Sequence, residues 1–338
     1  MRAFVINGKQ DGQVEEVATP EPGPGQVRLR IAYVGICGSD LHYWFNGANG
    51  AFEVTEPLIP GHEVSGTVDL DPSGRLAAGT PVTVHPATFG DSVPGLEDHK
   101  HLWPNGAYLG SASTKPHTQG GMSEYLIVDA SMVRTLPEGL DLRIAALAEP
   151  LGVVLHGINV AGGVQGKRVL VSGSGPIGLL AAAAALASGA AEVTSTDLLD
   201  GPLQRAKALG VQHTISLVTD RIPADSFDVA LECAGVPAAV DGCIAGLQKT
   251  GILAQIGMLP AGGNKIDLAS LISKEIQLRG CFRFNDEIDQ AVEMLAANPQ
   301  IAEVITHTIG ADAVLDAFNV AKDSQESGKV LVDLWTGQ

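Results

Sequence analysis

Cysteine is scarce in this chain of 338 residues, which contains only four. No two of them are closely spaced, so they do not form the repeated pattern of a disulfide framework. The sequence therefore argues against a disulfide-stabilised secreted domain and favours a reducing compartment. Three of the four, Cys233, Cys243 and Cys281, lie outside the ligand motifs described below and are predicted to be packing residues.

Basic residues are also few. The 21 Lys and Arg against 38 Asp and Glu give a formal net charge of −17. A surface of that sign repels phosphate backbones and anionic lipid headgroups. We therefore expect neither nucleic acid nor a membrane as partner, and expect a small-molecule substrate.

Long apolar runs are missing too. The longest candidate, 177–187, is too short to span a bilayer. The first residues form a short strand-like run without the pattern of a secretory signal. The expectation is a cytoplasmic protein.

What the sequence does contain indicates two domains, as its length requires. Residues 1–150 show mostly strand-type periodicity broken by Gly/Pro turns, with a long loop or lobe at 87–121. From residue 167 strands and helices alternate, which is typical of a doubly wound parallel sheet. We predict an α/β protein with a β-rich domain (1–150, completed by 285–338) and a dinucleotide-binding domain (151–284).

A glycine motif opens the second domain. Gly173, Gly175 and Gly178 follow an apolar strand and begin an Ala-rich helix, with Pro176 and Ile177 inside the motif. Such a turn lets a pyrophosphate approach the helix N-terminus. Asp197, at the end of the next strand, is placed to accept hydrogen bonds from a ribose diol and to repel a 2′-phosphate, so NAD is favoured over NADP. The alternative is a glycine-rich turn that binds nothing.

Three segments of the first domain supply metal-ligand types: Cys37, then His62-Glu63, then Glu149 before Pro150. A thiol, an imidazole and carboxylates suit zinc with one position open for substrate. Singly, Cys37 could be a small buried hydrophobe and His62 a turn histidine. Their order together with the glycine motif favours metal-assisted hydride transfer.

The quoted residues carry a resemblance. Gly35–Trp44, Gly61–Gly66, Gly120-Gly121, Glu149–Leu151, Gly173–Gly178 and Lys274–Phe284 are similar to the motifs of the zinc-dependent medium-chain dehydrogenase/reductase superfamily. Within it they resemble the polyol branch of sorbitol dehydrogenase and, most closely, bacterial L-idonate 5-dehydrogenase. The resemblance implies a GroES-like catalytic domain, a Rossmann domain and oxidation of a secondary alcohol of a polyol or sugar acid, L-idonate to 5-keto-D-gluconate being favoured.

Residue by residue, the resemblance implies that Cys37, His62 and Glu63 ligate zinc and that Glu149 contacts the ion or its water. It implies a proton relay from Ser39 to His42. A thiolate and a carboxylate together cancel the formal charge of a divalent ion. With a formally neutral zinc centre, Arg283 is the only nearby fixed positive charge that the motifs identify. The alternatives without a catalytic role are that Ser39 is a turn or capping residue, that His42 is a surface histidine and that Arg283 forms a structural ion pair.

The same resemblance implies the residues that line substrate and cofactor. Tyr43, Glu149, Arg283 and Phe284 are expected at the substrate. Along the cofactor, beside the glycine motif and Asp197, it implies Ile256, Gly257, Met258, Cys281, Phe282 and Arg283.

The sequence departs from the family in its lobe. Many members hold a structural zinc there with four cysteines, whereas residues 87–121 contain none. We predict one catalytic zinc per chain and no structural zinc, with His99 and His101 solvated. The lobe is predicted to be held by packing of Leu96, Leu102, Trp103, Tyr108 and Leu109.

Three further points concern the cofactor, the substrate and the assembly. Pro202 stands where polyol relatives often have an arginine near the ribose, which loosens the argument for tight cofactor binding. Sorbitol, xylitol or L-threonine are alternative substrates, and a metal-free nucleotide-binding relative is an alternative of a different class. A homodimer or homotetramer, often formed through the edge near Ile276–Phe282, is implied by the resemblance.

Overall fold

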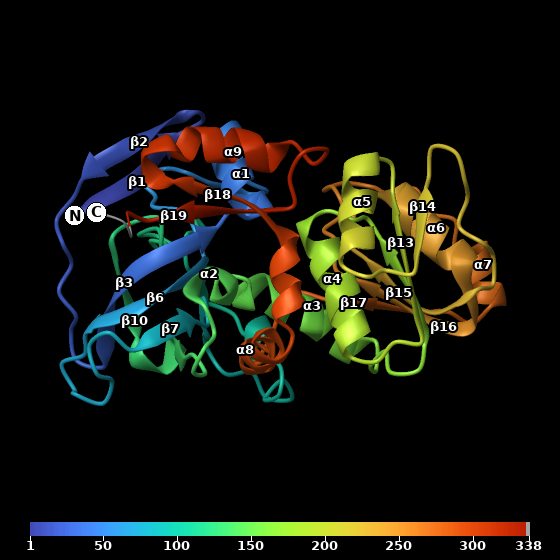
Figure 1. Cartoon of the computed structure of the whole chain (residues 1–338), viewed down its shortest axis with the longest axis horizontal. Coiled ribbons are helices and arrows are strands. Elements are labelled where there is room, and N and C mark those ends of the chain that lie inside the picture. Colours follow the sequence, from blue (N-terminus) through green and yellow to red (C-terminus); the bar gives the residue numbers. More distant parts are fainter. Residues whose placement is uncertain (336–338) are drawn as a thin grey trace. The chain divides into compact units, whose positions relative to one another are not determined.

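A computed structural model describes residues 1–335 of the chain, which fold into two compact units (Figure 1). The first unit comprises Met1–Glu149, His307–Lys322 and the segment from Lys329 onward. The second comprises Pro150–Thr306 and Asp323–Gly328.

The chain returns to the first unit at His307, later than the expected residue 285. The reason is packing in the second unit. Helix α8 (Ile288–Ala297) contacts η3 (Pro299–Val304), and η3 in turn contacts α4 (Pro176–Ala187). The buried side chains of Leu295, Ile301 and Val304 thus belong with the second unit.

The first unit is built on one large sheet, and every pair of its strands whose register is defined is antiparallel. In β3 (Gln26–Gly35), Val27, Leu29 and Ile31 are buried while Arg28 and Arg30 point to the other face, as period-two patterning requires. The strand order is β11-β7-β6-β3-β19-β18, with β10 also on β3. The other strands are β6 (Glu63–Leu70), β7 (Pro81–Val84), β10 (Tyr125–Asp129), β11 (Val133–Thr135), β18 (Ile305–Gly310) and β19 (Lys329–Asp333).

Short hairpins and helices surround this sheet. Helix α1 (Gly38–Asn46) was not expected from the sequence; its Trp44 packs against Phe4 and Phe318 at ring-centroid distances of 5.9 and 6.1 Å, which fixes the helix to β1 and α9. The small strands are β1 (Arg2–Gly8), β2 (Asp11–Glu16), β4 (Ala48–Asn49), β5 (Phe52–Glu53), β8 (Ala87–Thr88) and β9 (Ala107–Tyr108). The remaining helices are η1 (Lys100–Leu102), η2 (Ala130–Met132), α2 (Leu142–Ala145), η4 (Ala311–Ala313) and α9 (Val314–Lys322).

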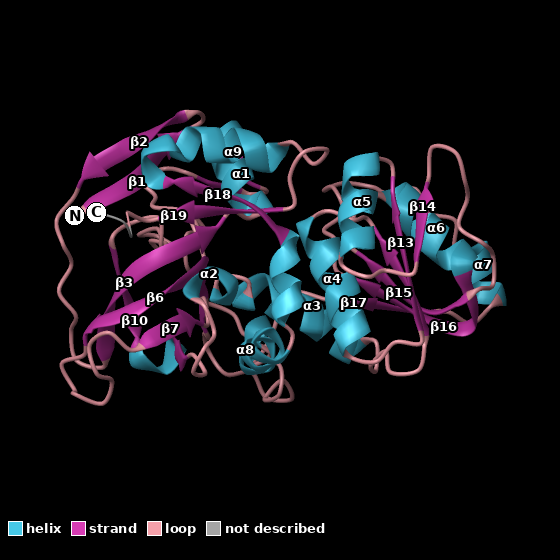
Figure 2. Cartoon of the chain, viewed as in Figure 1, coloured by secondary structure: helices cyan, strands magenta, loops and turns pink. Residues whose placement is uncertain are grey.

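The second unit is a parallel sheet of order β14-β13-β12-β15-β16-β17, flanked by helices (Figure 2). Its central strands are continuous buried apolar runs, such as Val169–Val171, as expected of a sheet covered on both faces. The strands are β12 (Arg168–Ser172), β13 (Glu192–Asp197), β14 (His213–Ser216), β15 (Phe227–Glu232), β16 (Leu247–Gln255) and β17 (Gln277–Gly280). The helices are α3 (Ala148–Val160), α4, α5 (Asp200–Ala208), α6 (Pro237–Gly246), α7 (Ala269–Ser273) and α8.

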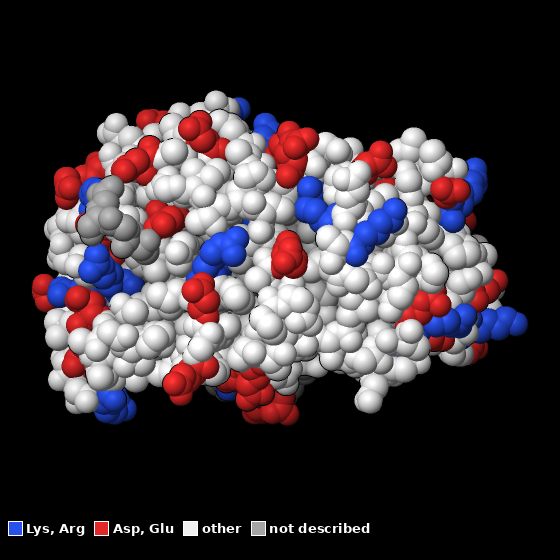
Figure 3. Space-filling view, in the orientation of Figure 1, with Lys and Arg blue, Asp and Glu red and all other residues white. Residues whose placement is uncertain are grey.

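This topology confirms the predicted α/β fold class, with a β-rich unit and a doubly wound parallel-sheet unit. The strand order reverses between β12 and β15, and in such sheets ligands bind outside the carboxyl ends of the strands at that point. Within residues 1–335, none of the helices has the length and apolarity needed to cross a bilayer. On the face shown in Figure 3, acidic side chains are spread out with basic ones between them.

Candidate metal centre and cofactor site

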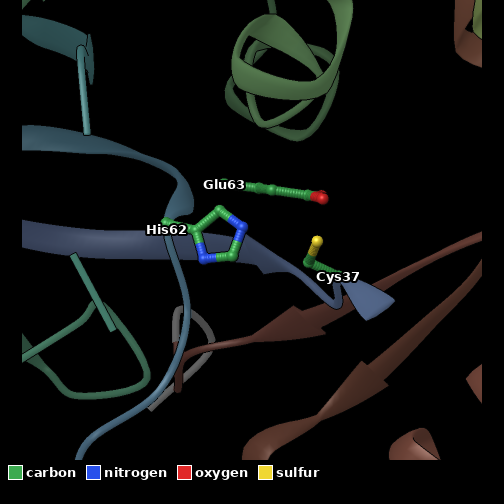
Figure 4. A group of neighbouring side chains, drawn as sticks. All are labelled: Cys37, His62 and Glu63. Atoms are coloured by element: carbon green, nitrogen blue, oxygen red, sulfur yellow. The ribbon is translucent and has the colours of Figure 1, made fainter. Parts of the chain in front are cut away.

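The three predicted ligands from the first half of the chain meet at the ends of two neighbouring strands. Cys37 follows β3 and caps α1. His62 lies directly before β6 and Glu63 opens it, and β6 pairs with β3 so that Gly35 faces Glu63. Their ligand atoms all lie within 4.8 Å of one another. Figure 4 shows the three side chains turned toward a common space.

Asp40 fixes the two loops that carry these ligands. Its Oδ2 accepts a hydrogen bond from the Cys37 amide (2.9 Å) and its Oδ1 one from the Gly61 amide (3.0 Å), and the side chain is fully buried. Gly61 has φ +96° and leaves no room for a side chain, since a Cβ would lie 2.6 Å from Val34 Cγ1. The sequence interpretation missed Asp40, although it lies inside the Gly35–Trp44 motif.

Glu63 has one satisfied oxygen and one unsatisfied one. Lys329 donates from Nζ to Glu63 Oε1 at 2.6 Å and to the Ile36 carbonyl at 3.1 Å, and both charged side chains are buried. Glu63 Oε2 is buried too, yet has no hydrogen-bond partner in the part of the chain that the structure describes. An orphaned carboxylate oxygen beside a thiol and an imidazole is what a zinc ion would satisfy, so the residues fit the metal.

The electrostatics of this site favour a cation. Burial alone would lower the pKa of His62, but the negative charge of Cys37, a hydrogen bond to it, and the charges of Asp40 and Glu149 raise that pKa well above its ordinary value. Burial raises the pKa of Glu149. The charge of His62 opposes this rise, and the charge of Glu63 adds to it. The acidic groups that favour a proton on the imidazole would equally favour a divalent ion.

Glu149 lies near the start of α3 and is held by a residue of the lobe. The Tyr108 hydroxyl donates to Glu149 Oε1 at 2.5 Å, and the Tyr108 ring meets the His62 ring edge-on at 5.4 Å. Glu149 is not a member of the three-residue group whose ligand atoms lie within 4.8 Å. Tyr108, predicted only as a lobe packing residue, therefore contacts two of the four proposed ligands.

The predicted relay residues lie on α1. Ser39 is half-buried, and His42 is exposed with its Nδ1 3.1 Å from Asn49 Oδ1. Tyr43, predicted at the substrate, is buried; its hydroxyl accepts from the Ala112 amide at 3.1 Å and lies 3.3 Å from Ser111 Oγ. A hydroxyl that accepts from a backbone amide can still donate its own proton to another group.

Arg283 and Phe284 belong to the second unit. Arg283 adopts the left-handed conformation (φ +51°), and its guanidinium lies over the Phe282 ring at 5.0 Å. Phe284 is buried, and a Cβ on Gly152 would lie 3.4 Å from its ring, so it packs closely on α3.

The glycine motif has the geometry of a phosphate-binding turn. Gly173 has φ +88°, Gly175 caps α4 and Pro176 starts it, while a Cβ on Gly178 would overlap the Gly173 carbonyl oxygen. Ile177 follows, half-buried. Asp197 ends β13 and accepts from the Ser174 amide at 2.8 Å and the Leu199 amide at 2.9 Å, so it holds this turn against the sheet.

A second buried carboxylate organises the opposite side of the switch point. Glu232, at the end of β15, accepts hydrogen bonds from the Ala234 amide (2.8 Å), the Gly235 amide (3.0 Å) and the Gln255 side chain. It thereby joins the ends of β15 and β16, next to the predicted cofactor residues Ile256 and Gly257. Met258 and Phe282 are exposed, 76% and 43% respectively, and Cys281 is half-buried.

The lobe follows the prediction only in part. Tyr108 and Leu109 are buried, and Trp103 donates from Nε1 to the Leu96 carbonyl at 2.8 Å. Leu102, in contrast, lies in η1 and is exposed, so packing of its side chain does not hold the lobe. The rings of His99 and His101 meet edge-on, with their centroids 5.9 Å apart.

Two family descriptions match the chain: "Alcohol dehydrogenase GroES-like domain" over residues 23–138 and "Zinc-binding dehydrogenase" over residues 176–297. The chain is 35% identical to the L-idonate 5-dehydrogenase (NAD(P)(+)) of Escherichia coli over 303 residues, which is 87% of each protein. It is 34% identical to the sorbitol dehydrogenase of Gallus gallus, over 95% of this chain and 93% of that protein. The crystal structure of the E. coli L-idonate 5-dehydrogenase superposes with a TM-score of 0.92 at 32% identity, covering 98% of both chains.

Proposed function

This chain belongs to the zinc-dependent medium-chain alcohol dehydrogenases and is similar to their polyol and sugar-acid members, and on that premise we propose that it oxidises L-idonate to 5-keto-D-gluconate with NAD. The observation that carries the proposal is the buried group of Cys37, His62 and Glu63, with an unsatisfied oxygen on Glu63. The glycine turn with Asp197 supports the dinucleotide.

The metal is proposed to be held by Cys37, His62 and Glu63, with Glu149 beside them. When bound, zinc supplies Lewis acidity that lowers the pKa of an alcohol. Lys329 balances the Glu63 charge through the Oε1 oxygen, which leaves Oε2 for the ion. Asp40 keeps the two ligand loops together.

The proton of the alcohol is proposed to leave through Ser39 and His42. Ser39 is half-buried two residues beyond Cys37, and His42 is exposed one helical turn later on α1. A hydroxyl followed by an exposed imidazole is suited to hand a proton to solvent.

For the cofactor, NAD is proposed over NADP. The Asp197 carboxylate would accept hydrogen bonds from the ribose diol and repel a 2′-phosphate, and Leu198 and Leu199 after it offer no positive charge. Ile256, Gly257, Met258, Cys281 and Phe282 are proposed to line the cofactor together with the glycine motif.

For the substrate, Arg283 is proposed to bind the carboxylate or vicinal hydroxyls of a sugar acid, because its planar fork matches both. Phe284 is proposed as its apolar neighbour, and Glu149 as a contact of the reacting hydroxyl. Tyr43 is proposed at the substrate as well, with its hydroxyl held in place by the Ala112 amide.

The test is NADH formation, followed spectrophotometrically, over L-idonate, sorbitol, xylitol and L-threonine, with 5-ketogluconate and NADH for the reverse direction. Turnover of L-idonate that a zinc chelator abolishes supports the proposal. Turnover of sorbitol, xylitol or threonine alone supports the alternative within the family. A chain that binds nucleotide but holds no metal and turns over none of them supports the non-catalytic alternative.

One zinc per chain is proposed, since residues 87–121 have no cysteine and, within residues 1–335, Cys37, His62 and Glu63 form the only such group of three. A cytoplasmic homodimer or homotetramer is proposed as well. The edge strand β17 supports it, because Leu278 on it and Phe282 after it are exposed apolar side chains. Metal analysis and the solution mass test these points.

A further inference from the structure

We propose that Tyr108 is a positioning residue that fixes the Glu149 carboxylate beside the candidate zinc ligands, and so couples the cysteine-free lobe to the metal centre. The inference rests on the proposed function in one respect, that Cys37, His62 and Glu63 hold a metal ion. It assigns a role to a residue for which the sequence predicted only packing.

The contacts of Tyr108 are specific. Its hydroxyl donates to Glu149 Oε1 at 2.5 Å, and both side chains are buried. Its ring lies edge-on to the His62 ring at 5.4 Å with an interplanar angle of 66°. One side chain of the lobe thus touches a proposed ligand and the acid next to it.

The backbone holds Tyr108 in this place. In the β8–β9 hairpin Tyr108 pairs with Ala87, and the Leu109 amide donates to the Pro86 carbonyl at 3.0 Å. The next residue, Gly110, lies so close to the turn before His62 that a Cβ on it would be 2.6 Å from the Gly61 nitrogen. The lobe strand is therefore packed on the very turn that presents His62.

The hydrogen bond determines how Glu149 can act. A carboxylate whose Oε1 accepts the Tyr108 hydroxyl presents chiefly its Oε2 to a metal ion or to a hydrogen of a metal-bound ligand. In a buried site this bond is charge-assisted, so it restrains the carboxylate strongly. Tyr108 consequently favours one orientation of Glu149, and its ring contacts the His62 ring.

Tyr108→Phe removes the hydroxyl and retains the ring that contacts His62. Zinc affinity of the full-length chain would be measured by chelator competition, and ligand geometry by the visible absorption bands of the cobalt-substituted protein. We expect about tenfold weaker zinc binding and a shifted cobalt spectrum, the scale of effect seen when a partner of a metal-site residue is lost. Tyr125→Phe, a hydroxyl deletion on β10 whose ring lies against Arg28, is the matched control and should change neither.

A double-mutant cycle separates positioning from a general structural effect. If Tyr108 acts through Glu149, the Tyr108→Phe change should alter zinc affinity by less than about twofold in a Glu149→Ala background, which leaves the hydroxyl no side-chain acceptor at that position. An unchanged zinc affinity and cobalt spectrum in Tyr108→Phe overturns the inference, as does an effect equally large in both backgrounds. A wild-type chain that takes up neither zinc nor cobalt overturns the inference and the proposed function together, whereas a metal-loaded wild type with an unaffected Tyr108→Phe overturns the inference alone.

Discussion

Lys329 and Glu63 form a buried ion pair, Nζ to Oε1 at 2.6 Å, although 266 residues separate them in the chain. The pairing follows from topology, because β19 and β6 both pair with β3 and so bring the C-terminal lysine to the ligand strand. Burial lowers the pKa of a lysine, but the charges of Glu63 and Cys37 more than offset this and raise the pKa of Lys329. The candidate metal site therefore contains a fixed positive charge that no sequence motif marked.

Lys329→Met tests that pair. Removing one member of a buried pair leaves the other as an uncompensated charge, so we expect the metal-free protein to lose about 3–5 kcal/mol of stability. Added zinc should restore a large part of the loss, since the ion supplies positive charge to Glu63. Thermal unfolding with and without zinc measures both effects. Lys322→Met, which removes an exposed lysine lying over Phe45, should stay within about 0.5 kcal/mol of wild type.

Asp40→Asn tests the link between the two ligand loops. The carboxylate accepts one backbone amide on each oxygen, whereas an asparagine presents an NH₂ group to one of the two donors. We expect a loss of about 1.5–3 kcal/mol in stability and weaker zinc retention during dialysis. Asp71→Asn, in an exposed turn, is the control. Wild-type zinc retention in Asp40→Asn would show that the loops hold their positions without this carboxylate.

Asp197→Asn tests the cofactor preference. The variant keeps one acceptor oxygen but loses the charge that repels a 2′-phosphate. Because a charge-assisted hydrogen bond is lost, we expect NAD to bind about tenfold more weakly. The affinity for NADP should rise relative to the affinity for NAD. Titration of the two dinucleotides against the purified chain gives both constants, with Asp200→Asn in α5 as control. A ratio of the two constants equal to that of wild type would assign cofactor preference to other residues.

Features formed by residues that are consecutive in the chain could be predicted from the sequence, whereas features formed by distant residues could not. The glycine turn with Asp197 was predictable because strand, turn and helix are consecutive, and the fold class followed from the alternation of strands and helices. Lys329 was missed because its partner Glu63 comes from a distant segment, and Glu232 because its contact to the end of β16 is made through Gln255.

The buried pair of His156 and Glu287 predicts a pH dependence of stability in the second unit. Burial raises the pKa of Glu287, but the hydrogen bond from His156 (2.9 Å) and its charge, with the Asn285 amide and Asn159, outweigh this and hold the pKa at about 2, below the ordinary 4.5. A carboxyl whose pKa is lowered by folding stabilises the protein above its unfolded pKa. That stability is lost as the pH falls from 4.5 toward about 2.

Glu287→Gln removes this contribution. At pH 6 the variant should be about 2–3 kcal/mol less stable than wild type, and the difference should shrink toward pH 2 as the wild-type carboxyl is protonated. Denaturant unfolding of both proteins across this range measures it, with the exposed Glu293→Gln on α8 as control. A difference that does not vary with pH would show that the loss comes from packing alone.

The edge strand β17 predicts that assembly can be separated from folding. Its open edge ends the six-stranded sheet, and Leu278 on the strand and Phe282 beyond it are 45% and 43% exposed. An uncovered apolar edge favours pairing with another strand, and an inserted charge opposes it. If the proposed oligomer forms through this edge, Leu278→Lys should sediment as a folded monomer, with the far-UV circular dichroism of the wild type. Val218→Lys, 71% exposed beyond β14 at the opposite edge, is the matched control and should keep the wild-type mass. A Leu278→Lys protein that sediments as wild type would assign the subunit contact to another surface.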